Sequence, residues 1–160
     1  MKELMEKIET YNIINYLFPG IIFGVAFEYL NEFKIYSESI AIMFFEYYFT
    51  GLVLSRIGSV IIKPILEKVK IVKYMNYNEF IEVEQKDVKI ELLQREANQY
   101  RTFIATFLCL TSIAIYNCLV GNFDKISLIF LFAGLTILFI LSYKKQIQFI
   151  ISRTKKGICQ

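Results

Sequence analysis

The sequence contains no histidine and only three cysteines, and this scarcity removes several classes of catalytic site. A histidine-assisted nucleophile, a His-rich metal site and intramembrane zinc proteolysis all require imidazole side chains. Cys109, Cys118 and Cys159 lack the CxxC spacing of metal and redox motifs, and the chain has no glycine-rich phosphate loop. We therefore expect no enzymatic activity, no metal and no cofactor.

Charged residues are also scarce, at 21% of the 160 residues, whereas 56% are hydrophobic and 16% aromatic. This balance is too apolar for an ordinary soluble domain and is typical of a membrane protein. A net charge of +3 is too small to indicate direct binding of nucleic acid. One compact unit fits the length, because four membrane-spanning helices of about 20 residues each would use roughly half of the chain.

Four apolar runs have the length that a spanning helix needs, which predicts an all-α membrane protein. The predicted spans are residues 12–30, 39–62, 102–120 and 126–143. Between the second and third spans, residues 67–101 carry both signs of charge and apolar residues at helical spacing. This pattern predicts a charged cytoplasmic helical extension that continues into the third span. Asn76 and Glu79 have the spacing of a capping pair, so the helix should start near Tyr77, and Pro64 should end the second span.

The distribution of positive charge predicts the orientation of the chain. If both termini and residues 67–101 are cytoplasmic, Lys34 and Lys125 are the only two of the 18 lysines and arginines on the outer side. This agrees with the positive-inside rule and predicts a multi-pass membrane protein with cytoplasmic termini. The basic tail after Tyr143 is expected to lie against anionic lipid of the inner leaflet.

The second span contains two ionisable residues, Glu46 and Arg56. An ionised side chain at the centre of a span costs about 2.5 to 3.5 kcal/mol on insertion scales, so such residues usually face protein or water. The two are about 15 Å apart along a helix and cannot neutralise each other. Thr111 and Ser112 lie at the depth of Glu46 and could donate hydrogen bonds to it. Arg56 needs carbonyls freed by Pro19, an acid from a second subunit, lipid phosphate or water, and it could also snorkel to inner headgroups.

Small residues recur at four-residue intervals, a spacing that favours close approach of helix backbones. The predicted packing residues are Pro19, Gly20, Gly24, Gly51, Ser55, Ser59 and Gly134. Pro19 should kink the first span, because proline removes a helical hydrogen bond. Chance occurrence in a glycine-tolerant segment remains the alternative for Gly20 and Gly24.

The apolar stripe of residues 67–101 packs within the chain or docks a cytosolic protein partner. In the second case the basic residues of this segment are expected to make the contact. These predicted docking residues are Lys86, Lys89, Arg95 and Arg101.

Three stretches resemble the small four-span membrane accessory proteins of bacterial antiviral defence systems. They are residues 15–20 (NYLFPG), residues 55–59 followed by Pro64, and residues 87–91 followed by 100–102. Proteins of this kind include the membrane partner of type VI CRISPR loci and the membrane subunit of the Kiwa system. The resemblance implies an oligomeric membrane component that works with a cytosolic, nucleic-acid-directed partner. It assigns no catalytic residue.

Three functions are compatible with these features. The first is a homo-oligomeric pore or membrane-perturbing effector in which Glu46 and the small-residue faces line or close a path. The second is a non-conducting scaffold or sensor that anchors a cytosolic partner. The third, a small transporter, is disfavoured because only two prolines could break helices and no internal repeat is visible.

Overall fold

The computed structural model describes residues 2–75, 87–120 and 125–158, with side chains at 13, 15–75, 87, 89–120 and 125–155. Within these ranges every regular element is a helix, so the predicted all-α class is confirmed for the described part of the chain. The elements are α1 (Lys2–Asn31), α2 (Ile40–Ile57), the π-helix η1 (Gly58–Ile62), α3 (Lys63–Lys68), α5 (Val88–Leu119) and α6 (Ile126–Ile158).

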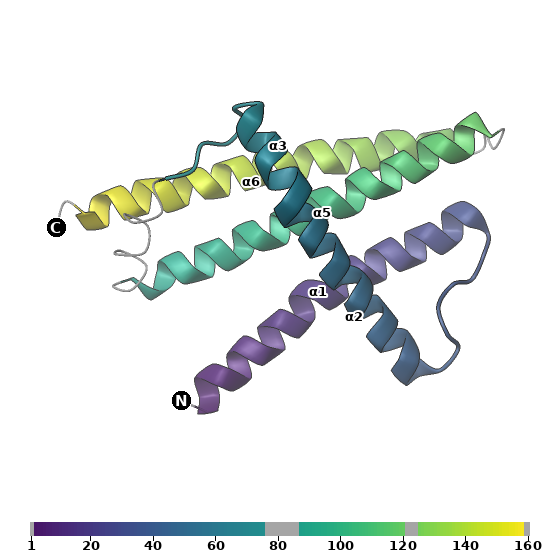
Figure 1. The fold of residues 1–160 in the computed structure, drawn as a ribbon, viewed down its shortest axis with the longest axis horizontal. Helices are drawn as coiled ribbons and strands as arrows, with labels where there is room; N and C mark the ends of the chain where they lie inside the picture. Colours follow the sequence, from purple (N-terminus) through teal and green to yellow (C-terminus); the bar gives the residue numbers. More distant parts are fainter. Residues whose placement is uncertain (1, 76–86, 121–124, 159–160) are drawn as a thin grey trace.

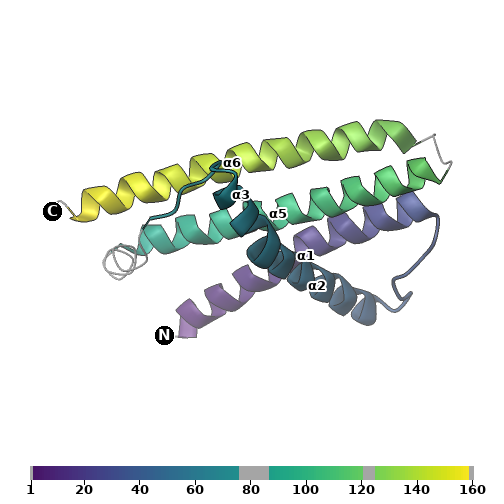
Figure 2. The ribbon, with the colours of Figure 1, turned by 45° about the horizontal axis from the view of Figure 1, so that its top comes forward.

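The helices α5 and α6 lie side by side as an antiparallel pair (Figures 1 and 2). Helix α1 lies along the carboxyl-terminal half of α5, and α2 crosses both helices obliquely. The start of α1 and the end of α6 lie at the same end of the molecule, on the left of Figure 1. We call this the inner end and the opposite end the outer end, following the orientation predicted from charge.

Three helical stretches are long and apolar enough to cross a membrane. They are Ile40–Lys68, Lys89–Leu119 and Ile126–Lys155, and they overlap the predicted spans 39–62, 102–120 and 126–143. The predicted span 12–30 lies within α1 but is not among the three, which were sought in the described residues only. A fourth span therefore remains a prediction.

The second span does not end at Pro64, because α2, η1 and α3 follow one another without a break to Lys68. A proline ring crowds the carbonyl group four residues before it and offers no amide hydrogen. Immediately before Pro64 the backbone adopts the wider π geometry, in which the Lys63 amide donates to the Gly58 carbonyl. The wider turn lets the helix continue past the proline. Helix α1 likewise continues through Pro19.

Helix α5 begins at Val88 and runs unbroken across the boundary between residues 101 and 102. Asp87 caps it, because its carboxylate accepts a hydrogen bond from the Lys89 amide at 3.0 Å. The helix start predicted near Tyr77 lies outside the described residues. The charged segment after Asp87 and the apolar segment after Arg101 thus belong to one helix.

The basic tail continues α6 as a helix to Ile158, and its contact with anionic lipid stays a prediction. Ile147 and Ile150, expected against lipid, are buried against the chain itself. They recur at helical spacing and meet apolar residues of α3 and α5, so packing within the chain covers them.

Two apolar clusters hold the helices together. The outer cluster comprises Leu30, Phe103, Phe107, Leu110, Ala114 and Phe132. The inner cluster comprises Ile62, Leu66, Val72, Ala97, Ile104, Ala105, Tyr143, Ile147 and Ile150. Between them the Phe139 ring stacks on Phe103 and Phe107, with ring centroids 4.8 and 5.5 Å apart. Only 11% of the apolar window of α6 is buried, which leaves most of that window free to contact lipid.

Candidate functional site

Helices α1 and α2 cross with their backbones in contact at two glycines. A Cβ atom at Gly20 would lie 3.0 Å from the amide nitrogen of Gly51 and would overlap the carbonyl oxygen of Tyr47. A Cβ atom at Gly51 would overlap the carbonyl group of Tyr16. Both positions therefore require glycine for close packing, and the predicted small-residue faces meet here.

The other predicted glycines differ from this pair. Gly24 faces aromatic rings, and a Cβ atom there would lie 2.5 Å from Tyr47 and 2.7 Å from Tyr36. Gly134 has nothing within 4 Å of its Cβ position, so the prediction that it packs against another helix is wrong within this chain. It lies on the exposed side of α6.

Glu46 is bound to the connection that precedes its own helix. Its Oε2 atom accepts a hydrogen bond from the Ser37 amide at 2.9 Å. Thr111 and Ser112, which were expected to donate to Glu46, donate instead to the carbonyls of Phe107 and Leu108 in their own helix, at 2.7 and 2.9 Å. The predicted grouping is wrong because each hydroxyl reaches the carbonyl four residues earlier without leaving α5.

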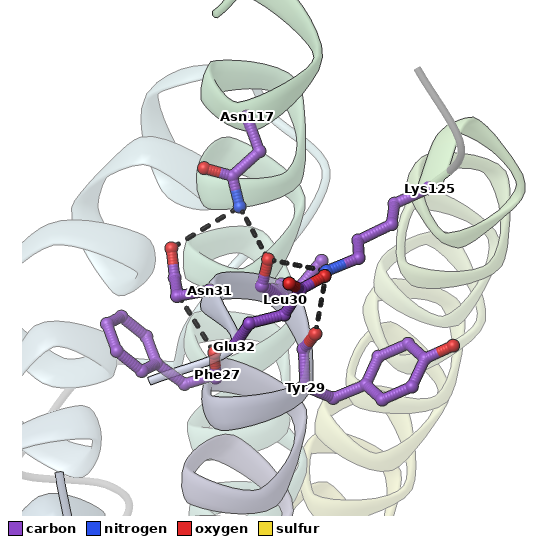
Figure 3. Close-up of polar contacts among 7 residues, drawn as sticks. All are labelled: Phe27, Tyr29, Leu30, Asn31, Glu32, Asn117 and Lys125. Carbon is purple, nitrogen blue, oxygen red and sulfur yellow. Dashed lines mark hydrogen bonds and ion pairs between the residues drawn. The ribbon is translucent and has the colours of Figure 1, made fainter. Parts of the chain in front are cut away.

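The carboxyl end of α1 is capped by two polar side chains that the sequence analysis did not single out as site residues (Figure 3). Lys125 Nζ donates to the carbonyls of Tyr29 and Leu30 at 2.9 and 3.0 Å and to Glu32 Oε1 at 2.9 Å. Asn117 Nδ2 donates to the Leu30 carbonyl at 3.1 Å. The last carbonyls of a helix lack partners within the helix and favour a cation, which explains the arrangement. The sequence offered two signals for this cap. Asn117 is an amide within the apolar run 102–120, and Lys125 directly precedes the apolar run 126–143.

A polar cleft of about 210 Å³ lies toward the inner end, between α1, the rod formed by α2 and η1, and α5. Among the described side chains, the lining includes three arginines and no aspartate or glutamate. The lining residues are Asn15, Tyr16, Ser55, Arg56, Ser59, Arg95, Asn98, Gln99, Arg101 and Thr102. We call this the arginine cleft. It brings together Ser55, Arg56 and Ser59 of the second span with two predicted docking residues.

Arg101 is buried in this cleft, with only 9% of its surface exposed. Its Nη2 atom donates to Ser59 Oγ at 2.8 Å, and the Ser59 hydroxyl donates to the Ser55 carbonyl at 3.1 Å. Its Nε atom is buried and has no hydrogen-bond partner among the described residues. Gly58 makes room, since a Cβ atom there would lie 3.1 Å from the Arg101 carbonyl oxygen. The predicted docking role is wrong for Arg101, because its guanidinium group faces the interior of the chain.

The remaining basic residues have different surroundings. Arg56 is exposed and has no ion-pair partner in the part of the chain that the structure describes. Arg95 forms an ion pair with Glu91, one helical turn earlier. Lys89 is exposed at the start of α5, and Lys86 lies outside the described residues.

Residues 88–101 of α5, some of which line the cleft, pair with residues 144–155 of α6 (Figure 1). We call this paired segment, together with Asp87, the inner stalk. Arg153 Nε donates to Asp87 Oδ2 at 2.5 Å, and this hydrogen bond lowers the pKa of the Asp87 carboxyl. Gln146 Nε2 donates to Glu96 Oε2 at 2.7 Å. These contacts join the start of α5 to the end of α6.

The described residues thus form a cap at the outer end, an arginine cleft and an inner stalk. Each of the three contains charged side chains, namely Lys125 in the cap, the arginines of the cleft, and Asp87 and Arg153 in the stalk. No group of three or more His, Cys, Asp or Glu side chains in the described ranges could hold a metal ion. Comparison with protein-family models, with curated proteins and with solved structures finds no match to this chain.

Proposed function

We propose that this chain is a membrane anchor that holds a cytosolic protein partner at the bacterial inner membrane through the inner stalk. The observation that carries the proposal is the continuity of α5 and α6, each of which runs from an apolar segment into the stalk without a break. The contacts of Arg153 with Asp87 and of Gln146 with Glu96 join the two helices. A helical pair joined in this way presents a surface in a fixed orientation to the membrane.

The stalk carries exposed side chains that suit a protein partner. Leu92 of α5 and Phe149 of α6 are about half exposed, at 51% and 52%, and Lys89 is exposed nearby in sequence. Apolar anchors with basic neighbours are typical of surfaces that dock a helix or an acidic segment. We do not expect the chain to bind nucleic acid directly.

The resemblance to membrane accessory proteins of antiviral defence supplies the setting of the proposal. In that setting the partner is a cytosolic, nucleic-acid-directed protein, and anchoring places it at the inner membrane during infection. This setting rests on the stretches at residues 15–20, at 55–59 followed by Pro64, and at 87–91 followed by 100–102.

A homo-oligomeric pore is the second candidate, and the exposure of Arg56 favours it. Arg56 lies in a candidate span of which only 28% of the apolar window is buried. A charged side chain exposed within a membrane span has a high free-energy cost unless other copies of the chain or water surround it. In that arrangement sister copies of α2 would surround a polar path, and Glu46 would contribute to it.

The test places a photo-crosslinking residue at position 92 or 149 of the full chain in the bacterium that encodes it, with position 130 on α6 as the control. Phe130 is 76% exposed and belongs to the apolar window, so lipid should surround it. The anchor proposal expects one cytosolic protein to be crosslinked at 92 and 149 but not at 130. It also expects Leu92→Glu to abolish both the crosslink at 149 and protection from phage.

Glu46→Gln separates the two candidates. The anchor proposal expects this variant to keep partner crosslinking and protection, whereas a pore lined by Glu46 would change its ion flux and lose protection. Flux through the purified chain in liposomes, together with equal crosslinking at 92 and 130, would reject the anchor.

A further inference from the structure

We propose that the arginine cleft binds a phosphate group, carried by a lipid headgroup at the inner membrane surface or by a soluble phosphate ester. The inference does not depend on the anchor proposal, because it rests on the cleft alone. Three arginines line the cleft, and none of the lining residues that the structure describes is acidic. Arg95 is paired with Glu91, so Arg56 and Arg101 carry the positive charge that an anion in the cleft would neutralise.

The buried guanidinium group of Arg101 is the strongest indication of a ligand. A charge removed from water is costly unless it is paired and hydrogen-bonded. The group is 9% exposed, its described hydrogen bond goes to the neutral Ser59 hydroxyl, and its Nε atom is buried without a described partner. Arginine remains protonated, so it cannot relieve this cost by losing a proton.

The geometry of the cleft suits a phosphate group in particular. Arginine donates through a planar fork that matches two oxygens of a phosphate, and such charge-assisted bonds are stronger than neutral ones. Arg56 reaches the same cleft from α2, so the two guanidinium groups come from different helices. Asn15, Asn98 and Gln99 add amide groups to the lining. A liquid water occupies about 30 Å³, so the cleft volume has room for a phosphate group.

The position of the cleft fits a phosphate at the membrane surface. It lies where α5 changes from charged to apolar, at the junction of Arg101 and Thr102. Tyr16 lines the cleft, and tyrosines are enriched at the level of lipid headgroups. A lipid phosphate occupies this level, and a soluble phosphate ester could enter from the inner side.

The test uses the full chain purified in a phosphate-free, uncharged detergent and three probes. Dioctanoyl phosphatidylglycerol carries the phosphate on a lipid, dioctanoylglycerol has the same acyl chains without it, and inorganic phosphate represents the soluble source. Native mass spectrometry counts bound molecules, and thermal unfolding measures the stabilisation that binding gives. The variants are Arg56→Gln, Arg101→Lys and, as a matched loss of an exposed positive charge, Lys89→Gln.

We expect the phosphatidylglycerol probe to bind the native chain and dioctanoylglycerol not to bind. Arg56→Gln should weaken binding about tenfold, because it removes a charge-assisted hydrogen bond. Arg101→Lys keeps the charge but loses the fork and should also weaken binding, whereas Lys89→Gln should leave it unchanged. Binding of both phosphate probes assigns recognition to the phosphate group itself, binding of phosphatidylglycerol alone assigns the site to lipid, and binding of inorganic phosphate alone assigns it to a soluble ester.

Two results would overturn the proposal. One is the absence of binding by either phosphate probe to the folded native chain. The other is binding that Arg56→Gln and Lys89→Gln reduce equally, which would indicate general attraction to positive charge. In the first case, dissociation of an oligomer by Arg56→Gln would indicate that a carboxylate of a second copy, and not a phosphate, neutralises the cleft. Arg56 is exposed, so its variant should fold even if that of Arg101 does not.

Discussion

At the scale of single residues, the crossing of α1 and α2 depends on two glycines, Gly20 and Gly51, which have no side chain to separate the backbones. Gly20 and Gly51 each bring their backbone against a carbonyl group of the other helix, those of Tyr47 and Tyr16. Backbone cannot move aside as the end of a flexible side chain can, so a methyl group here must push the helices apart.

We predict that Gly51→Ala will lower the stability of the chain by about 1 to 3 kcal/mol, the usual cost of overpacking. Gly134→Ala is the matched control, because its added methyl group meets nothing within 4 Å. This control should be neutral or slightly stabilising, since alanine favours a helix by up to about 1 kcal/mol over glycine. Thermal unfolding in detergent measures both. Equal stability of the two variants would mean that the helices do not cross at Gly51.

Lys125 supports a second prediction at this scale. Its side chain is 15% exposed, and its ammonium group bonds to the Tyr29 and Leu30 carbonyls. Lys125→Met should loosen the last turn of α1, at a cost of about 0.3 to 1 kcal/mol for the helix terminus and more for the lost hydrogen bonds. Its ion pair with Glu32 adds little, because Glu32 is 82% exposed.

Hydrogen exchange at residues 27–31 is the measurement for Lys125→Met, and faster exchange is expected. Lys34→Met is the control, since Lys34 is an exposed lysine of the connection that follows α1. Faster exchange in the control but not in Lys125→Met would contradict the cap.

Spacing in the sequence predicted the packing glycines but not the partners of polar side chains. Gly20 and Gly51 could be found because close approach needs a small residue whatever lies opposite. The partners of Glu46 could not be found in this way. Depth along a helix does not show whether a hydroxyl, such as that of Thr111, already donates to a carbonyl of its own helix.

At the scale of elements, the inner stalk depends on Asp87, which serves two helices. Its carboxylate caps α5 through the Lys89 amide and accepts a hydrogen bond from Arg153 of α6. The Arg153 hydrogen bond holds the pKa of Asp87 below its ordinary value of 3.8. Because the folded pKa is the lower one, the stabilisation is complete above the ordinary value and is lost as the pH falls through the folded pKa.

We predict that Asp87→Asn will raise hydrogen exchange in the first turn of α5 and around Arg153 at neutral pH. The native chain should show the same change only below pH 3.8, where its carboxylate becomes protonated. Glu91→Gln is the control, since the exposed pair of Glu91 with Arg95 contributes little. A native chain whose exchange here is already fast at neutral pH would show that Asp87 does not join the helices.

The element boundaries show where sequence patterns fail. Pro64 indicated the end of a helix, yet the π geometry of η1 carries the helix past it, and η1 starts at Gly58, where the rod packs against Arg101. The charge of the basic tail indicated contact with lipid but did not reveal that two of its isoleucines, Ile147 and Ile150, pack in the inner cluster. Periodicity identifies an apolar face without saying what covers it.

At the scale of the whole molecule, the start of α1 and the end of α6 lie at the inner end, and the connection from α1 to α2, which contains Lys34, lies at the outer end (Figures 1 and 2). Lys125 also lies at the outer end, because it bonds to the carboxyl end of α1. The two ends of the described chain thus lie on the same side, and their cytoplasmic location stays a prediction from the charge distribution. Three helical stretches are apolar enough to span, and α1 would be the fourth. If α1 did not cross, Lys34 would lie on the same side as the amino terminus.

Labelling of single cysteines in intact cells tests the central claim, that a membrane-spanning bundle projects its stalk into the cytoplasm. The native cysteines are first replaced by serine, and a cysteine is then placed at position 34 or position 89, both exposed. A membrane-impermeant maleimide should label position 34 in intact cells and position 89 only after the cells are permeabilised. Labelling of both positions in intact cells, or recovery of the chain in the soluble fraction, would contradict the account.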